Sequence, residues 1–142
     1  MWVYSFDPGA TTGFCLLATE PGLRVTESRE LVSWKDWGVL ERCWIKPCVI
    51  VAESFHLFPG AAQHLINNVF PAAQKIGVIE YLAWKTDIRV VFQAPSIKKM
   101  FPDKELRVHL PGYVLPSSDH IRDALRHAVY YYFNNLWPKL KT

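Results

Sequence analysis

A continuous apolar run at residues 48–52 (CVIVA) constrains the fold of this chain more than any other feature, and it ends in Glu53. The run is short and rich in β-branched residues, which is typical of a buried strand at the centre of a sheet. An acid directly after such a strand must lie near buried surface, so Glu53 is less easily explained as an ordinary turn residue.

The other hydrophobic patterns predict an α/β order of elements. Three strand-like segments come first, Trp2–Asp7, Thr12–Ala18 and 23–32, and Pro-Gly turns separate them. We then expect, in chain order, a helix from Ser33 to Trp44, the strand at 48–52, a helical region at 61–84 kinked or divided by Pro71, a strand at 87–92, a short basic helix after Ser96, a loop at 101–116, and a last helix from Ser117 or Ser118 to about Leu136. Three antiparallel strands followed by parallel βαβ units predict a five-stranded mixed sheet flanked by helices, although several α/β folds begin in this way.

Length and composition predict one compact domain over residues 1–142. Half of the residues are hydrophobic, which is enough for a real core and argues against disorder. The formal net charge of +3 is compatible with a polyanionic partner but does not require one. The three cysteines lack CxxC spacing, so neither a disulfide framework nor a zinc site is expected. Without a signal-like segment or a membrane-length apolar stretch, the expected location is cytoplasmic.

Acids and a histidine collect where the predicted sheet should end. Asp7 ends the first strand and Glu53 the central one, and neighbouring strands of an open α/β sheet end side by side. His120 and Asp123 share one face of the last helix through their i, i+3 spacing, and His127 continues that face. We expect this polar edge to lie beside the functional end of the sheet and outside the core.

This set suits phosphodiester hydrolysis, in which two divalent ions activate water and stabilise the leaving oxygen. Mg²⁺ prefers carboxylate oxygens, so Asp7, Glu53 and Asp123 are candidate ligands, with Mn²⁺ as a substitute ion. His120 is expected to bind one metal or to hold or relay a proton. The alternatives are structural: Asp7 alone more often caps a turn, and His120 and Asp119 suit a helix N-terminus.

Five segments together resemble the RuvC-type Holliday junction resolvases, which have a ribonuclease H-like fold. They are FDPGATTGF at 6–14, VIVAESF at 49–55, AAQKIGVIEYLA at 72–83, QAPSIKK at 93–99 and HIRDALRHA at 120–128. Each motif alone has low to moderate specificity, but their order and spacing match over most of the chain.

The resemblance implies a Mg²⁺-dependent, dimeric endonuclease of DNA recombination and repair that nicks two opposing strands of a four-way DNA junction. It maps Asp7, Glu53, His120 and Asp123 onto the catalytic, metal-binding set. Some members carry an acid in place of His120, which makes Asp119 a substitute candidate. Segment 100–118 departs from the Gly-rich, Lys-bearing stretch of the family, and the short length suggests a compact phage-encoded version.

Contacts to DNA are predicted from basic and aromatic side chains near these motifs. Lysines attract phosphate, and a basic surface beside the site would draw on Lys98, Lys99, Lys75, Lys104 and Arg107. For any one lysine, a solvated face is an equally good interpretation. Phe55, His56 and Phe58 follow Glu53, and an exposed ring there would stack on unpaired bases. A place in the core explains these rings equally well.

A two-fold junction calls for a two-fold dimer, so a homodimer is expected. The helical region at 61–84 is apolar on more than one side, which would cover the sheet and also pair with a second copy. The alternative is a doubly buried helix in a monomer.

Three rival functions remain open from the residues alone. Another ribonuclease H-fold nuclease would use the same acids on branched DNA or on an RNA–DNA hybrid. DPGATTG also resembles the phosphate-binding loop of actin-like and sugar-kinase domains, but those proteins need two such domains around a nucleotide. A DNA-binding protein without catalysis would keep the fold, and the presence of all four site residues argues against it.

Overall fold

The computed structural model describes residues 1–40, 44–55 and 70–137. Its strands are β1 (Trp2–Asp7), β2 (Thr12–Ala18), β3 (Arg24–Leu31), β4 (Cys48–Glu53) and β5 (Val90–Gln93). They form one sheet in the order β3-β2-β1-β4-β5, antiparallel between β3, β2 and β1 and parallel between β1, β4 and β5. The predicted five-stranded mixed sheet is therefore confirmed.

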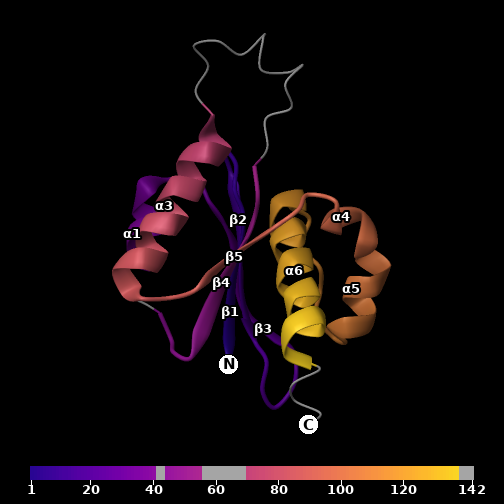
Figure 1. Cartoon of the computed structure of the whole chain (residues 1–142). Helices are drawn as coiled ribbons and strands as arrows, with labels where there is room; N and C mark the ends of the chain where they lie inside the picture. The colour runs from indigo at the N-terminus through magenta and orange to yellow at the C-terminus, as the bar shows by residue number, and fades with distance from the viewer. Residues whose placement is uncertain (41–43, 56–69, 138–142) are drawn as a thin grey trace.

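Helices cover both faces of this sheet (Figure 1). They are α1 (Trp34–Leu40), α3 (Pro71–Thr86), α4 (Ile97–Met100), α5 (Asp103–His109), α6 (Asp119–Tyr131) and the π-helical turn η1 (Tyr132–Leu136). In Figure 1 α1 and α3 lie on one side of the sheet, and α4, α5 and α6 lie on the other. None of the helices in the described part of the chain is long and apolar enough to cross a membrane.

The alternation of side chains along the central strands divides the core into two layers. Val3, Val49 and Val51 pack with α6 in one cluster. Tyr4 and Ile50 point the other way, into the cluster that α1 and α3 cover. Burial of side chains of this size contributes about 1.5–3 kcal/mol each, so the packed sheet is a rigid base for what its ends carry.

The last helix begins at the cap that the sequence offers. Ser118 is its N-cap, and the Ser118 hydroxyl accepts a hydrogen bond from the backbone N–H of Ile121 at 3.4 Å. The single helix predicted to reach Leu136 is present as two consecutive elements, α6 and the π-helical turn η1, which ends at Leu136.

The predicted loop at 101–116 is wrong, because this segment contains α5. Its prolines flank the helix instead of interrupting it: Pro102 is the N-cap and Pro111 follows the C-terminal end. Leu106 and Leu110 are spaced one turn apart and are buried against α6. The prolines favour a loop by composition, whereas the spacing of Leu106 and Leu110 is the sequence signal that indicates a helix.

Two further boundaries concern α3 and β5. Pro71 stands at the first turn of α3, where a proline costs no hydrogen bond, so it begins a helix there. The rest of the helical region predicted at 61–84, residues 61–69, lies outside the described residues. At the other end, Asp87 caps α3 with φ at 53°, and β5 starts only at Val90 and not at residue 87.

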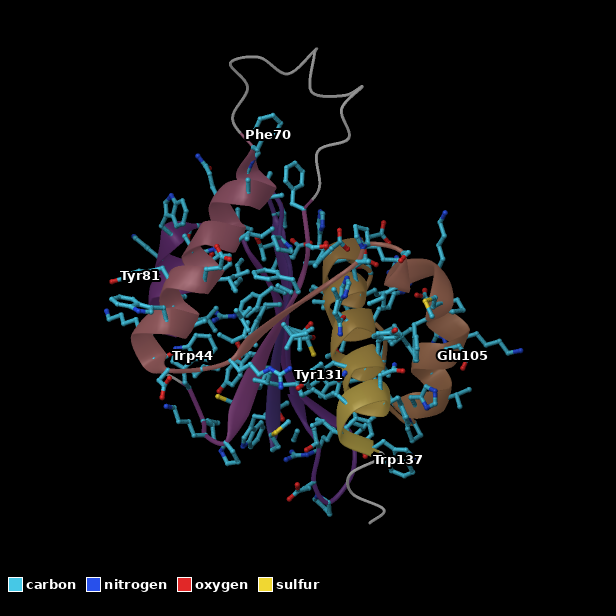
Figure 2. The ribbon with its side chains drawn as sticks, viewed as in Figure 1. Trp44, Phe70, Tyr81, Glu105, Tyr131 and Trp137 are labelled. Atoms are coloured by element: carbon cyan, nitrogen blue, oxygen red, sulfur yellow. The ribbon has the colours of Figure 1, made fainter. Side chains whose placement is uncertain are left out.

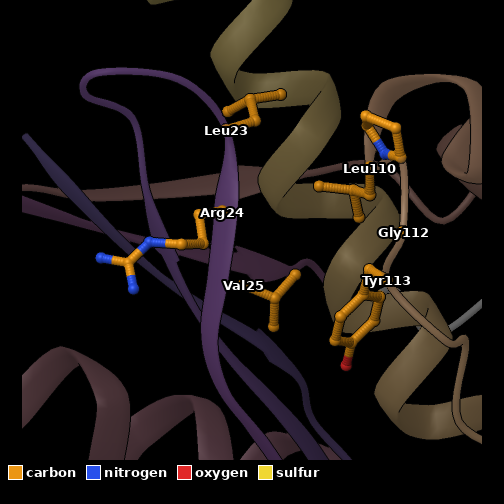
Figure 3. A pocket seen from close by; sticks show the side chains of 7 residues that line it. Leu23, Arg24, Val25, Leu110, Gly112 and Tyr113 are labelled. Atoms are coloured by element: carbon orange, nitrogen blue, oxygen red, sulfur yellow. The ribbon is translucent and has the colours of Figure 1, made fainter.

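A hollow of about 240 Å³ lies between the start of β3 and the loop after α5 (Figure 3). Leu23, Val25, Leu110 and Tyr113 contribute to its lining. Arg24 pairs with Ala18 in the sheet, and Ala18 pairs with Trp2, so this hollow lies at the end of the sheet opposite to Asp7. It is separate from the acids described next.

Candidate active site

Three polar side chains leave the ends of adjacent strands toward the same helix. Successive residues of a strand face opposite sides, so Asp7 faces the α6 side like Val3, and Glu53 does so like Val51. Gln93 is paired with Glu53 in the β4–β5 register and faces the same way. Asp7, Glu53 and Gln93 are the last residues of β1, β4 and β5, so they lie side by side at one end of the sheet, opposite to the N-terminal end of β1. Figure 1 shows β1 rising from the N-terminus toward this end.

Lys98 from α4 joins the acids at this point. Its Nζ atom lies 3.2 Å from Oδ1 of Asp7, 3.0 Å from Oε2 of Glu53 and 2.8 Å from Oδ2 of Asp123. We call these three acids the carboxylate cluster. One ammonium group therefore occupies the place where three negative charges converge.

Gly13 allows α6 to come this close to the sheet. A Cβ atom at Gly13 would lie 1.8 Å from the backbone oxygen of His120, so only glycine fits here. Gly13 pairs with Asp7 across the β1–β2 hairpin. This approach sets Nδ1 of His120 at 3.0 Å from Oδ2 of Asp7.

Asp123 is held from two sides. Lys98 contacts its Oδ2, and Arg126 donates to its Oδ1. Arg126 also donates from Nε to the backbone oxygen of Phe101 at 2.9 Å and forms an ion pair with Asp103 of α5. Sequence reasoning missed Arg126, although its i, i+3 spacing from Asp123 was a usable signal.

His127 supports the third acid from inside the core. Its side chain is 0% exposed, and its Nε2 lies 3.1 Å from Oε2 of Glu53. Its Nδ1 lies 2.7 Å from Oε1 of Gln93. The expectation that the polar edge of the last helix stays outside the core is wrong for His127, because Glu53 and Gln93 supply partners for a buried ring.

The electrostatics differ from one acid to the next. Burial raises the pKa of Asp7 above its ordinary value; the hydrogen bond with His120 and the charge of Lys98 oppose this, while the two neighbouring carboxylates reinforce it. Burial also acts to raise the pKa of Glu53, but hydrogen bonds from His127 and Lys98 outweigh it and lower that pKa.

The carboxylate cluster in turn changes the pKa of Lys98. Burial disfavours the charged form of Lys98, yet the hydrogen bond to Asp123 and the charges of Asp7 and Glu53 outweigh it and raise its pKa well above the ordinary value. Lys98 is therefore a fixed positive charge at neutral pH.

The carboxylate cluster fits a hard divalent cation by its chemistry. All three side chains offer charged oxygens, the ligands that Mg²⁺ prefers, and all lie within 3.2 Å of one cationic nitrogen. Among the described residues, no group of three histidine, cysteine or acidic side chains is spaced to hold a metal as it stands. Binding of a metal ion by these three acids would require the Lys98 ammonium group to move aside.

Asp119 does not join this cluster. Its side chain is 82% exposed and forms an ion pair with Arg122 on its own helix. Of the two alternatives at the start of the last helix, His120 is the one whose side chain contacts Asp7.

The predicted basic residues separate into different environments. Lys99 and Lys104 are exposed, and so is Arg107. Lys98 points into the carboxylate cluster and not outward. Lys75 is only 7% exposed, and its ammonium group lies 3.4 Å from the centre of the Trp34 ring in the layer of α1 and α3. The expectation that Lys75 belongs to a basic surface beside the site is wrong, because the tryptophan covers it.

Of the predicted aromatic contacts, Phe55 is 38% exposed, and its ring centre lies 5.9 Å from that of Phe70. It is thus neither a core residue nor a fully free ring. Phe58 and His56 lie outside the described residues.

No protein-family model matches the chain, and no curated protein matches its sequence. RuvC of Thermus thermophilus is similar over 100% of this chain and 98% of its own, with 18% identity and a TM-score of 0.71.

Two similar structures are complexes with junction DNA. T. thermophilus RuvC with a Holliday junction substrate is 19% identical, covers 99% of this chain and 96% of its own, and has a TM-score of 0.70. The fowlpox virus resolvase with its substrate Holliday junction DNA is 13% identical over 91% of this chain and 97% of its own, with a TM-score of 0.59. At these identities the comparisons speak for the fold, and the chain has the ribonuclease H-like fold of the RuvC-type Holliday junction resolvases.

Proposed function

We propose that this protein is a metal-dependent endonuclease that resolves four-way DNA junctions by paired, symmetric nicks. The observation that carries the proposal is the convergence of Asp7, Glu53 and Asp123 on one point at the end of the sheet. Structures with the same fold include two resolvases bound to Holliday junctions, which favours a junction over other nucleic acids as the substrate.

The carboxylate cluster would hold Mg²⁺, most simply two ions, with Mn²⁺ as a substitute. Bound divalent ions lower the pKa of water and stabilise the leaving oxygen of a phosphodiester. The protein contributes the arrangement: two acids come from rigid strands and one from a helix, and each has a second partner that fixes it.

His120 adds a group for proton transfer or for metal binding. Asp7 accepts a hydrogen bond from Nδ1 of His120, which orients the ring and leaves Nε2 as the functional nitrogen. This nitrogen can accept a proton from the attacking water or serve as a ligand. Its side chain is half exposed, so substrate can reach it.

The DNA backbone would contact exposed cations next to the cluster. Lys99 follows Lys98 on α4, and Lys104 is an exposed residue in the first turn of α5. Phe55, partly exposed beyond Glu53, is the described candidate for stacking on a base. Because phosphate contacts carry most of the affinity, changes at Lys99 and Lys104 should weaken binding to all DNA sequences equally.

The decisive experiment is cleavage of a synthetic four-way junction and of its linear duplex arms with Mg²⁺. Wild type should cut only the junction, with paired symmetric nicks. Asp7→Asn should reduce cutting by at least about 1,000-fold, since it removes a charged ligand of the cluster. Asp87→Asn is the matched control, because Asp87 caps α3 at the other end of β5 and asparagine tolerates its left-handed backbone.

Each other outcome selects a different function. Cutting of linear duplex or of an RNA–DNA hybrid would retain the metal chemistry and refute the junction assignment. Binding of junctions without cutting, at any Mg²⁺ or Mn²⁺ concentration, would identify a DNA-binding protein that keeps the fold without catalysis.

A further inference from the structure

A buried hydrogen-bonded chain leads from the core into the carboxylate cluster. Gln93 at the end of β5, His127 of α6 and Glu53 at the end of β4 follow one another at 2.7 Å and 3.1 Å. His127 is fully buried and Gln93 is buried, so solvent does not compete for these contacts. This series of hydrogen bonds therefore connects β5, α6 and β4 at the point where Glu53 enters the carboxylate cluster.

The position of His127 would suit an apolar side chain. Its neighbours on α6, Leu125, Ala128 and Val129, are all completely buried in the core. Burying an imidazole costs free energy unless both ring nitrogens are paired. Both are paired here, and one partner is a member of the carboxylate cluster.

The partners determine the direction of the hydrogen bond between His127 and Glu53. Oε2 of Glu53 and Oε1 of Gln93 are both acceptors, so both ring nitrogens of His127 donate in this arrangement. If the side-chain amide of Gln93 is rotated by 180°, its NH₂ group faces Nδ1 of His127. A neutral His127 ring would then accept a hydrogen bond at Nδ1 and donate one from Nε2 to Glu53. In both arrangements Nε2 of His127 donates to the carboxylate of Glu53.

We propose that His127, held by Gln93, is a positioning residue that fixes the carboxylate of Glu53 for metal binding; this rests on the proposed function. A glutamate side chain has free torsions that must be immobilised when it binds an ion. Nε2 of His127 holds Oε2 from the protein side, while Lys98 approaches the same oxygen at 3.0 Å. When the ammonium group moves away, His127 keeps the carboxylate in place.

The test is the affinity for Mn²⁺ of the protein without DNA, measured by calorimetry and by electron paramagnetic resonance. His127→Leu should weaken Mn²⁺ binding about 10–100-fold, as loss of a second partner of a ligand typically does. His127→Gln should recover most of that loss, because its amide nitrogen can still donate to Glu53. The double variant His127→Leu/Gln93→Leu should bind Mn²⁺ no more weakly than His127→Leu alone, because Gln93 acts on Glu53 only through His127.

Leu125→Ala is the control for a merely structural effect. It removes a fully buried side chain of the same helix and should lower the melting temperature without changing the affinity for Mn²⁺. Unchanged Mn²⁺ affinity in His127→Leu, or an equal loss in Leu125→Ala, would overturn the positioning role while the cleavage function stands. Absence of Mn²⁺ binding in wild type would overturn the metal-dependent function and this inference with it.

Discussion

Lys98 determines the charge balance of the carboxylate cluster. It stands among three acids that no other cation of the described residues contacts together. The ammonium group therefore reduces the repulsion among the carboxylates, as the proposed divalent ion would. We therefore expect Lys98, the third residue after the Ala94-Pro95 pair, to contribute to stability as well as to the site.

Replacement of this lysine should make stability depend on metal and on pH. For Lys98→Met we expect the free energy of unfolding to fall by about 1–2 kcal/mol near neutral pH, because the acids then repel one another without compensation. Urea denaturation with and without Mg²⁺ measures this effect. Mg²⁺ should raise the free energy of unfolding more in Lys98→Met than in wild type. Lys99 is exposed on the same helix, so the control variant Lys99→Met should behave like wild type.

The sign of the pH dependence follows from the pKa shifts. The pKa of Lys98 is raised, so this side chain stays protonated from acid to neutral pH and loses its charge only in strong alkali. The pKa of Glu53 is lowered, so the stability that its contacts supply is lost as pH falls. The deficit of Lys98→Met should therefore be largest near neutral pH and should shrink as the acids are protonated. A constant deficit would contradict the charge argument.

The contact between α6 and β2 depends on a single glycine. Gly13→Ala would drive a methyl group into the backbone of His120, which cannot yield like a flexible side chain. We expect a loss of about 1–3 kcal/mol in the free energy of unfolding and, since α6 moves with His120, a loss of cleavage. Gly77→Ala in α3 is the matched control: nothing lies within 4 Å of its added methyl, so about 0.5–1 kcal/mol of stabilisation is expected. Equal effects at both positions would refute the close-approach argument.

Paired nicks require two sites, so the whole molecule should act as a homodimer. The outer side of α3 remains the candidate interface: Trp84 is 79% exposed, and Tyr81 next to it points away from the sheet (Figure 2). Trp84→Glu should shift the sedimentation of the protein from dimer to monomer and replace paired nicks with slow single nicks. Val114, after α5, is an apolar side chain that is 85% exposed, and the Val114→Glu variant should remain dimeric. A wild-type monomer that still makes paired nicks would refute the dimer.

Much of the fold was predictable because period and propensity are local properties. The alternation in β1, the apolar run of β4 and the Ser118 cap each mark an element by its immediate neighbours. The helix α5 was not predicted from its own segment, because its prolines favour a loop by composition. They flank a helix that is stabilised by the burial of Leu106 against α6. In such cases tertiary packing outweighs local composition.

The sequence by itself determined the five-stranded sheet and the ends of the strands that carry Asp7 and Glu53, since both follow from patterns within a few residues. Only the tertiary structure decided the partners of these acids. Lys98 turns inward, and His127 lies in the core as a support for Glu53. These roles depend on the approach of α4 and α6 to the sheet, and contacts between residues far apart in the chain leave no periodic signal in the sequence.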